Sequence, residues 1–546
     1  MDNLQKTAII AFFSAEGYFR LHSETSKTKK IEALKEQFEI EFQTELNQEI
    51  LDILELYRDE QRAVKHAREK ARIEKLKNLP LSAGCNKSNE HIQYLPHGKY
   101  VLTSAQNNTD IDNGMLESLQ TFCKENGARL LIGRLTYNKN GFAQPDINNN
   151  DGGLWYAPEI KPYLVSGHLC LGSKHHFIAD ANIMPTAKNP LIGFAGIVPA
   201  GENAYLPATK ISLKVEAALK NAKVKLLAST GTVTKRNYIL RKVGATAAIE
   251  HSIGALYINT ETDEIRHLEQ MEGFTGFYDL TDLYLPDGKF TLENHISALQ
   301  LGDIHAEKVE DKNLHNAIDL IQDLQPKSII IHDLQDFSSR NHHNIKDPAF
   351  LHVQHVNNNT VQGDLKLVAK ILDKLISCLP DSSDIHVIES NHDLAINTWL
   401  KNSDFKVDPV NAVTYLTCML ALYKHQEKTG NSQFNMLKYA YKQIGRGKYA
   451  DKIQFHETDE SVMISGVEMG NHGHNGVNGS RGSPMQFRTL GVAMNTGHTH
   501  TPGITGKVYT AGVTASLEMG YNLGASSWAI AHIVTYENGQ RQIIFA

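Results

Sequence analysis

The sequence predicts an α/β protein with a helical N-terminal segment. From about residue 292, short apolar runs alternate with polar loops and amphipathic stretches, as strands alternate with helices. From Ile31 to Tyr57, apolar residues recur every three or four positions, which is typical of one helix face. Hydrophobic residues make up 41% and charged residues 21% of the 546 residues, values that exclude wholesale disorder. This length favours about two to four domains.

Residues 1–80 are expected to form a helical N-terminal region. Its apolar face from Ile31 to Tyr57 either packs on its own chain or joins a second copy, so a homo-oligomer is one alternative. The stretch from Arg58 to Lys77 holds eight Lys or Arg residues against four Asp or Glu. Such a basic helix is either a solvated face or a contact for nucleic acid or another partner. The Pro- and Gly-containing residues 79–98 are expected to be a linker.

Residues 95–290 are expected to form an accessory α/β or α+β domain. Two strands are expected at 100–103 and 129–132, with a helix between them at 115–125. A hairpin is expected later, around 260–263. The Asn- and Gly-rich segment 138–153 should be a surface loop. Four residues invite comparison with a metal cluster, but their spacing fits no usual zinc site and no carboxylate stands beside them: His168, Cys170, His175 and His176.

Residues 292–546 are expected to form the catalytic domain. The expected strands are 298–301, 329–331 and 385–388, and the helices between them carry apolar residues at 314–324 and 365–375. Because the carboxyl ends of parallel strands meet at one edge of a sheet, the polar loops that follow these strands should form one site. A helical insertion is expected at about 394–460, with helices at 413–423 and 434–444. A strand at 508–513 and a hairpin at 528–545, with a type I′ turn at Asn538-Gly539, should complete the fold.

Five short motifs supply oxygen and nitrogen ligands along this region. In chain order they are Asp303-x-His305, Asp333-x-x-Asp336, Asn391-His392-Asp393, His472-Gly473-His474 and Gly497-His498-Thr499-His500. Each alone is an ordinary polar turn, whereas all five in this order, three of them at expected strand ends, predict a metal centre. Carboxylate, amide and imidazole ligands suit Mn²⁺, Fe²⁺ or Zn²⁺, and the lack of a thiolate argues against structural zinc.

With these motifs, residues 292–546 resemble the calcineurin-like metallophosphoesterases. The resemblance implies a two-sheet sandwich flanked by helices, and two divalent cations. Mn²⁺ is the first candidate, and Mg²⁺, Fe²⁺ or Zn²⁺ are the alternatives. The implied ligands are Asp303, His305 and His500 for one cation, Asn391, His472 and His498 for the other, and Asp333 as the bridge. The resemblance also implies that His392 protonates the leaving oxygen, with Asp336 as its carboxylate partner.

The chain departs from the family pattern in places that spare the ligands. His332 and Ser390 stand where glycines normally precede the bridging aspartate and the Asn-His pair. Phe337 and Ser338 replace the arginine and glycine of the protein-phosphatase branch, which disfavours a protein-phosphatase activity.

The expected chemistry is phosphodiester hydrolysis, in which two cations generate a bridging hydroxide nucleophile. The long N-terminal extension and the Gly-rich loop 473–482 favour a polymeric substrate, and the chain resembles the SbcD-type DNA nucleases and, more distantly, early DNA-degrading proteins of tailed phages. A metal-dependent DNA nuclease for DNA degradation or processing is therefore the first expectation, with Arg481 and His474 as substrate-binding groups. The alternative interpretation of the loop 473–482 is a flexible connector. A small-molecule phosphodiesterase or nucleotidase is the alternative, and a scaffold with a decayed active site ranks last.

Charge, hydropathy and cysteine usage limit the partners and the cellular compartment that we expect. The formal net charge is −6, so DNA binding would need a local basic patch or metals. No apolar run reaches the ~18 residues of a membrane span, so we expect no membrane partner. The five cysteines are scattered and form no CxxC pair, which indicates a reducing cytoplasm, that of the host cell if a phage encodes the chain.

Overall fold

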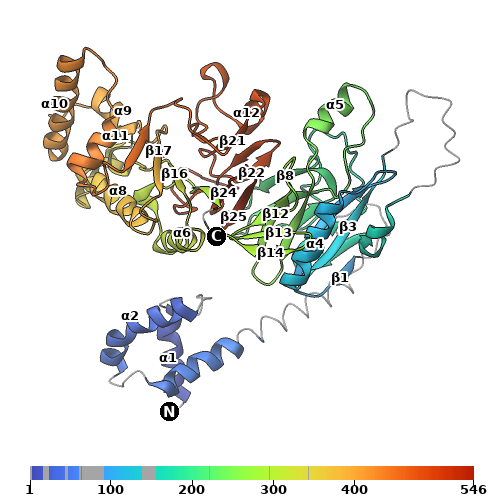
Figure 1. Cartoon of the computed structure of the whole chain (residues 1–546). Coiled ribbons are helices and arrows are strands. Elements are labelled where there is room, and N and C mark those ends of the chain that lie inside the picture. The colour runs from blue at the N-terminus through green and yellow to red at the C-terminus, as the bar shows by residue number, and fades with distance from the viewer. Residues whose placement is uncertain are drawn as a thin grey trace. The chain divides into compact units, whose positions relative to one another are not determined.

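The computed structural model describes residues 3–15, 24–42, 47–60, 63, 92–137, 155–220, 222–293, 295–341 and 344–546. The chain divides into two compact units, Met1–Ser88 and Asn89–Ala546. The larger unit combines several sheets with helices, so the predicted α/β class is confirmed (Figure 1). Among the described residues, no helix is both long and apolar enough to cross a membrane.

The N-terminal unit is helical where it is described. Helices α1 (Asn3–Ala15) and α2 (Glu24–Phe42) and the helical residues 48–60 share one small apolar core around Phe13 and Phe38. A single continuous helical face from Ile31 to Tyr57 was expected, and this is wrong. The backbone of Asn47 is not helical, and its side chain accepts a hydrogen bond from the Ile50 amide at 3.2 Å, as at the start of a new helix. The basic stretch after Glu60 lies outside the described residues, apart from residue 63.

An eleven-stranded sheet runs through the larger unit. In spatial order its strands are β1 (Gln93–Leu95), β5 (His168–Leu171), β6 (His175–Ile178), β7 (Asn203–Leu206), β9 (Lys225–Gly231), β8 (Ala208–Glu216), β22 (Gly503–Thr505), β23 (Val508–Thr510), β21 (Ala493–Thr496), β20 (Val467–Glu468) and β19 (Met463–Ile464). Strands from both sides of residue 292 share this sheet, because β8 pairs with β22 in antiparallel register. The division into accessory and catalytic domains stays a prediction.

Two smaller sheets complete the part of the chain before residue 292. One contains β11 (Glu264–Glu269), β10 (Gly254–Asn259), β2 (Lys99–Gln106), β3 (Arg129–Leu135) and β4 (Leu164–Val165), and the other contains β12 (Phe277–Asp279), β13 (Asp282–Leu285) and β14 (Gly288–Thr291). Helix α4 (Asn113–Asn126) begins at Asp112, whose side chain accepts from the Met115 amide, and α5 (Lys242–Ile249) follows later. The strands, helix and hairpin predicted here are confirmed, and the expected loop at 138–153 lies outside the described residues.

A six-stranded sheet positions the first three ligand motifs. Its order is β18 (Ile453–His456), β17 (Asp384–Ile388), β16 (Ser328–His332), β15 (Ile296–Gln300), β24 (Ala531–Tyr536) and β25 (Arg541–Phe545). The first four strands run parallel, and β24 and β25 form the expected antiparallel hairpin. Its turn is not the predicted type I′, since Gly539 has a positive φ of 82° whereas Asn538 does not.

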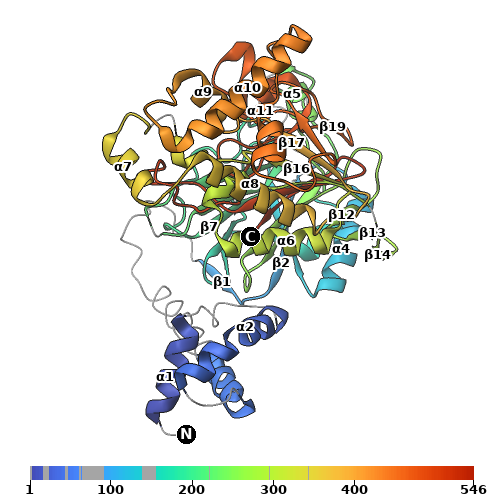
Figure 2. The same cartoon turned by 90° about the vertical axis from the view of Figure 1, so that its left-hand side faces the viewer.

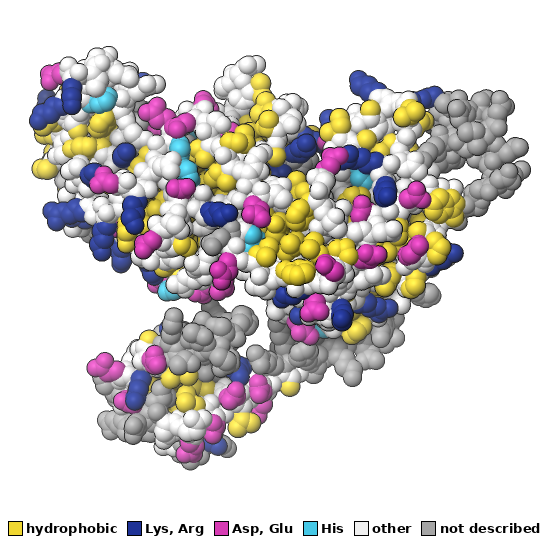
Figure 3. Space-filling view, in the orientation of Figure 1, with side chains coloured by type: hydrophobic (Ala, Val, Ile, Leu, Met, Phe, Trp, Pro, Cys, Tyr) yellow, Lys and Arg dark blue, Asp and Glu magenta, His cyan; other side chains and the backbone are white. Residues whose placement is uncertain are grey.

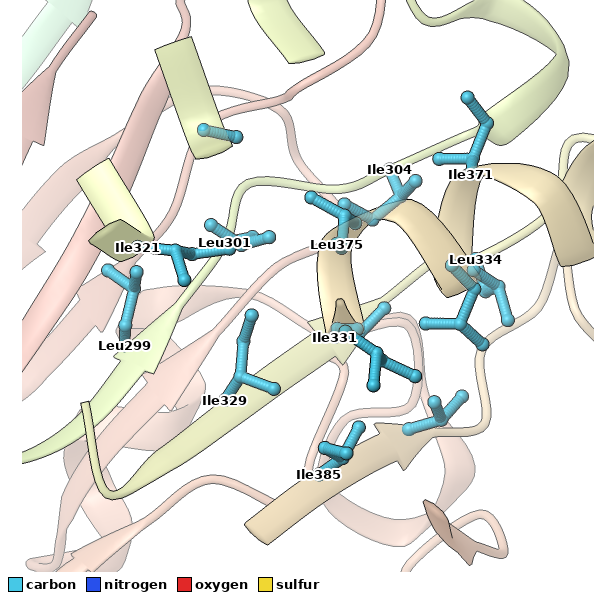
Figure 4. Packing of buried hydrophobic residues seen from close by; sticks show 14 of the residues in the cluster. Leu299, Leu301, Ile304, Ile321, Ile329, Ile331, Leu334, Ile371, Leu375 and Ile385 are labelled. Carbon is cyan, nitrogen blue, oxygen red and sulfur yellow. The ribbon is translucent and has the colours of Figure 1, made fainter. Parts of the chain in front are cut away.

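Both faces of this sheet are covered by apolar side chains. On one face, α6 (Asp311–Leu324) and α8 (Val361–Ile376) bring Ile321 and Leu375 onto Leu299 and Ile331 (Figure 4). This packing confirms the helices expected at 314–324 and 365–375. On the other face, the buried Ala298, Ile330 and Ile388 cluster with Val467 of the eleven-stranded sheet. Two sheets therefore pack against each other beneath the motif loops.

Further helices lie beyond the third motif. Helices α9 (Ala395–Asn402), α10 (Ala412–Thr429) and α11 (Met436–Tyr439), the last continued by a π-helical turn at Ala440–Ile444, gather together at one end of the unit (Figure 2). They confirm helices at the two expected positions. The larger unit also contains two short helices, α7 (Pro348–Val356) and α12 (Pro484–Phe487). On the face that Figure 3 shows, acidic and basic side chains are interspersed over the described surface, in keeping with the similar numbers of basic and acidic residues in the chain, 55 and 61.

Candidate metal centre

The predicted ligands come from loops at one edge of the paired sheets. Asp303 and His305 follow β15, Asp333 follows β16, and Asn391 follows β17. Since these three strands are parallel neighbours, their carboxyl ends bring the three loops together. The loop after β21 adds His500, which forms a group of four with Asp303, His305 and Asp333.

Four of these side chains converge on one point. The ligand atoms of Asp303, His305, Asp333 and His500 all lie within 4.8 Å of one another. His305 Nε2 is 2.9 Å from His500 Nε2 and 3.3 Å from Asp333 Oδ2, and His500 Nε2 is 3.3 Å from Asp303 Oδ2. Atoms that share one cation at about 2.0–2.2 Å stand roughly 3 Å apart, so this spacing fits a bound divalent metal ion.

Asp333 also faces the second predicted ligand set. Its Oδ2 atom lies 3.3 Å from His472 Nε2 and 3.7 Å from His500 Nε2. The ring of His498 is 5.3 Å from that of His472, centre to centre. Asn391 directly precedes His392 in the chain. Its Oδ1 atom is buried and has no hydrogen-bond partner among the described residues.

The centre concentrates buried polar atoms that find no hydrogen-bond partner in the described chain. They include both carboxylate oxygens of Asp333, Asp303 Oδ1, Asn391 Oδ1 and both ring nitrogens of His472. Buried polar atoms in folded proteins are almost always paired, and a gathering of unpaired polar atoms is what metal ligands leave. The donor set is therefore compatible with a metal ion.

Electrostatics at the centre follow from burial and from the mixture of carboxylates and imidazoles. Burial raises the pKa of Asp303 to about 7, and the neighbouring Asp333 carboxylate adds to this effect. Burial disfavours the charged form of His305, but the carboxylates of Asp333 and Asp336 raise its pKa to about 10. For His498 and His500, burial prevails and lowers the pKa to about 4, which keeps both imidazoles neutral and able to bind metal.

The backbone of the site is held in unusual conformations. His305, Asp333, His498 and His500 have φ values of 41°, 43°, 70° and 54°, in the left-handed region that non-glycine residues rarely adopt. Such strain is typical of functional loops that the surrounding structure fixes. Gly497 has no such φ, but a Cβ atom there would lie 2.2 Å from Asp303 Oδ1, so only glycine leaves room for this carboxylate.

A second group joins the centre to the predicted acid. Asp336 Oδ1 lies 3.5 Å from His305 Nδ1 and 3.5 Å from His392 Nδ1, and the rings of the two histidines meet edge to face at 4.6 Å. His392 is half-buried, and burial lowers its pKa although Asp333 and Asp336 oppose that change. The structure thus brings Asp336 and His392 together, as expected from their motifs.

The two predicted substrate groups lie farther along the loop 473–482. The ring of His474 is half-buried, 5.5 Å from that of His472. Arg481 is exposed, and its backbone pairs with that of Asn475. The loop is closed by the Gly482 amide, which donates to the His474 carbonyl at 3.0 Å. In the described structure no contact joins the Arg481 guanidinium to the ligand cluster, so its role stays a prediction.

The sequence analysis missed three side chains that contact residues of the metal centre. Glu307 accepts hydrogen bonds from the amides of Asp336 and Phe337 at 2.7 and 2.8 Å and so fixes their turn. Tyr521 donates to Asp336 Oδ1 at 3.4 Å, and the ring of Trp528 lies 4.3 Å from that of His500. No spacing in the sequence signals these contacts.

The histidines near residue 170 form a different arrangement. His168 Nε2 is 2.8 Å from His176 Nδ1, and His176 Nε2 is 2.8 Å from Glu202 Oε2. A carboxylate does stand beside them, contrary to expectation, because β6 and β7 are neighbours and bring Glu202 close. These side chains satisfy one another by hydrogen bonds. Two other histidines, His342 and His343, lie outside the described residues.

Comparison with known proteins adds a relative but no domain model. No protein-family model matches the chain. The chain is 40% identical over 483 residues to Protein A1 of Escherichia phage T5, and the match covers 85% of this chain and 85% of that protein. The chain belongs to the Protein A1 family. Membership of this family agrees with the phage origin that the sequence suggested.

The name of this relative states no activity, so any function for this member of the Protein A1 family has to be argued from the site. A large cleft elsewhere does not supply one: it has a volume of about 1010 Å³ and is lined by residues such as Lys210, Glu250 and Arg488. None of the predicted ligands lines it. The unpaired donors and acceptors of the metal centre are therefore the best guide to chemistry.

Proposed function

We propose that this protein is a metal-dependent phosphodiesterase that degrades or processes DNA, with two divalent cations bridged by Asp333. The observation that carries the proposal is the position of Asp333 Oδ2, 3.3 Å from His305 Nε2 and 3.3 Å from His472 Nε2. One carboxylate oxygen thus stands between imidazoles from the two predicted ligand sets. Mn²⁺ is the first choice of metal, since it accepts carboxylate, amide and imidazole ligands together.

The arrangement of the strands supports a calcineurin-like catalytic domain. In that family the ligands sit on loops at the ends of strands in two packed sheets, and here the loops after β15, β16, β17, β20 and β21 carry them. Ala298 and Ile330 of one sheet pack with Val467 of the other below these loops. His332 and Ser390, the departures from the family pattern, are buried and displace no ligand.

The chain's own residues would divide the work of hydrolysis. Two bound cations would clamp the phosphate and activate a water for in-line attack. Asp333 is short enough to hold both cations, and Asn391 completes the coordination without adding negative charge that would repel a phosphate. His392, held 3.5 Å from Asp336, is placed to protonate the leaving oxygen.

A nucleic-acid substrate is favoured over a small ester by the rest of the chain. The basic stretch from Arg58 to Lys77 fits an enzyme that acts on DNA. A small-molecule phosphodiesterase needs no such stretch. The protein would work in the host cytoplasm, where phage DNA and host DNA are both within reach.

The test is incubation of the purified protein with plasmid DNA and with bis-p-nitrophenyl phosphate, in Mn²⁺ and in EDTA. Loss of DNA only in the presence of metal supports the proposal. Cleavage of the small ester but never of DNA would favour the small-molecule alternative. Inertness towards both substrates, together with no metal bound at equilibrium, would leave only a scaffold role.

A further inference from the structure

Aromatic rings form a closed circuit around the Asp336 side of the metal centre. The rings of His392, His305, His500, Trp528 and Tyr521 follow one another at centre-to-centre distances of 4.6, 4.8, 4.3 and 5.7 Å. The circuit closes at 6.1 Å between Tyr521 and His392. The three histidines have roles in the proposed reaction, whereas the two larger rings have none.

Tyr521 is anchored at one end and open at the other. Its hydroxyl donates to the buried Asp336 Oδ1 at 3.4 Å, and yet the residue is 46% exposed. Trp528, by contrast, is half-buried against His500, so its face is less free. An exposed aromatic ring fixed at the rim of a polar catalytic site is a ready surface for stacking.

The loop that carries Tyr521 is held in place by its own hydrogen bonds. The Met519 amide donates to Asn522 Oδ1 at 3.2 Å, and Asn522 Nδ2 donates to the Leu517 carbonyl at 2.7 Å. Met519 is buried, whereas Leu517 and Leu523 are 42% and 86% exposed. These hydrogen bonds hold the exposed ring of Tyr521 in one place beside the metal centre.

We propose that Tyr521 is the stacking platform for a nucleobase, that of the nucleoside attached to the leaving oxygen of a single DNA strand. This inference rests on the proposed function. In the proposed reaction His392 protonates the leaving oxygen. The base of the leaving nucleoside is separated from that oxygen by one sugar. The ring of Tyr521 lies 6.1 Å from the ring of His392 and is 46% exposed, so it is within reach of a base on that sugar.

Stacking on Tyr521 requires a base that is free of its own duplex. A paired base already stacks on its neighbours, and taking it out costs several kcal/mol in general, least where it is unpaired. The platform therefore selects single strands or frayed ends. Because every base has a π face, the platform gives little preference for sequence.

The experiment compares Tyr521→Leu, which removes the ring, with Tyr521→Phe, which keeps the ring and removes only the hydroxyl. The substrates are oligothymidylate and an oligomer of tetrahydrofuran phosphodiesters of equal length, which has the same charge and no bases. Base–aromatic stacking is worth about 5–150-fold in affinity. Tyr423→Leu, which changes an exposed tyrosine on α10, is the matched control.

We expect Tyr521→Leu to lower kcat/KM on oligothymidylate by about 5–150-fold more than on the base-free oligomer, chiefly through KM. Tyr521→Phe should show no such difference between the two substrates. An equal loss on both substrates for Tyr521→Leu, or a loss in Tyr521→Phe as large as in Tyr521→Leu, would overturn the stacking role. The second result would show that the hydroxyl acts by positioning Asp336.

A binding measurement separates this inference from the proposed function. Fluorescence anisotropy with labelled oligothymidylate in EDTA reports stacking without any hydrolysis. Weaker binding by Tyr521→Leu, but not by Tyr521→Phe or Tyr423→Leu, supports the platform even in a protein that cleaves nothing. Undiminished binding by Tyr521→Leu would reject the platform even in a protein that proves to be an active nuclease. Melting temperatures and metal content confirm that each variant is folded and loaded.

Discussion

The substitution Gly497→Ala should disable the metal centre through one atom. A Cβ atom at this position would lie 2.2 Å from Asp303 Oδ1. The Asp303 carboxylate has to retreat by about 1 Å to restore an ordinary carbon–oxygen contact. Metal–ligand distances tolerate only ~0.2 Å, so the carboxylate leaves its place in the ligand group. Because changes that merely disturb a ligand's orientation cost ~10–100-fold in metal affinity, we expect at least that loss here.

The assay is titration of the EDTA-stripped protein with Mn²⁺ by calorimetry, with the bound metal counted after gel filtration. Gly196→Ala is the matched control, because a Cβ atom at Gly196 meets nothing within 4 Å. We expect the control to bind like the unchanged protein, and Gly497→Ala to remain folded by circular dichroism. Unaltered affinity and stoichiometry in Gly497→Ala would refute the placement of Asp303 among the ligands.

Three further outcomes follow from the structure and the sequence. His392→Ala should retain its metal and lose about 10²–10⁴-fold in rate on DNA, and much less on bis-p-nitrophenyl phosphate, whose leaving group departs unprotonated; metal loss, or an equal drop on both, would remove the acid role. Neutralising four basic residues between Arg58 and Lys77 should weaken DNA binding and flatten its salt dependence in an anisotropy titration, whereas hydrolysis of the small ester should hold. Burial lowers the pKa of His267 to about 4 although its hydrogen bond to the Ser229 carbonyl opposes this, so the unfolded chain binds the proton first. The contribution of His267 to stability should therefore be constant above pH 6.5 and fall by up to about 3 kcal/mol towards pH 4, and His267→Gln should remove that part of the pH dependence in urea titrations.

The strands and the ligand loops were within reach of the sequence because their signals are local. The run at 329–331 is apolar without interruption, and the run at 385–388 is apolar apart from His386, as in strands that are covered on both faces. Each leads into a motif, and the parallel pairing of β16 with β17 then brings the loops of Asp333 and Asn391 to the same edge of the sheet. Order along the chain and one topological rule therefore sufficed to bring distant residues together.

The features that the sequence did not predict arise from contacts between distant segments. Nothing near Tyr521 indicates that its hydroxyl reaches Asp336, 185 positions away in the chain. The approach of Glu202 to His176 depends on the parallel pairing of β6 with β7, which the irregular chain between them conceals. The prediction of one continuous helix across Asn47 failed for the opposite reason. The apolar residues recur there without interruption, and this regular pattern hides the helix cap at Asn47.

The hairpin at the end of the chain shows the limit of a local signal that is otherwise strong. Asn-Gly between two apolar runs did locate the turn between β24 and β25. The loop is longer than the two residues of a type I′ turn, since the Tyr536 amide bonds to the Gln540 carbonyl across three intervening residues. Gly539 alone takes the left-handed conformation, as in a type I turn followed by a bulge.

The most direct test of the metal-bridging account is hydrolysis of plasmid DNA by Asp333→Asn, measured with Mn²⁺ beside Asp319→Asn. The first substitution keeps the size of a buried side chain that faces His305 and His472 but removes its charge, and the second makes the same change on the exposed face of α6. We predict that Asp333→Asn folds, loses bound metal and falls by several orders of magnitude in rate, whereas Asp319→Asn is unchanged. Near-normal, metal-dependent hydrolysis by Asp333→Asn would contradict the assignment of Asp333 as the bridge between two cations.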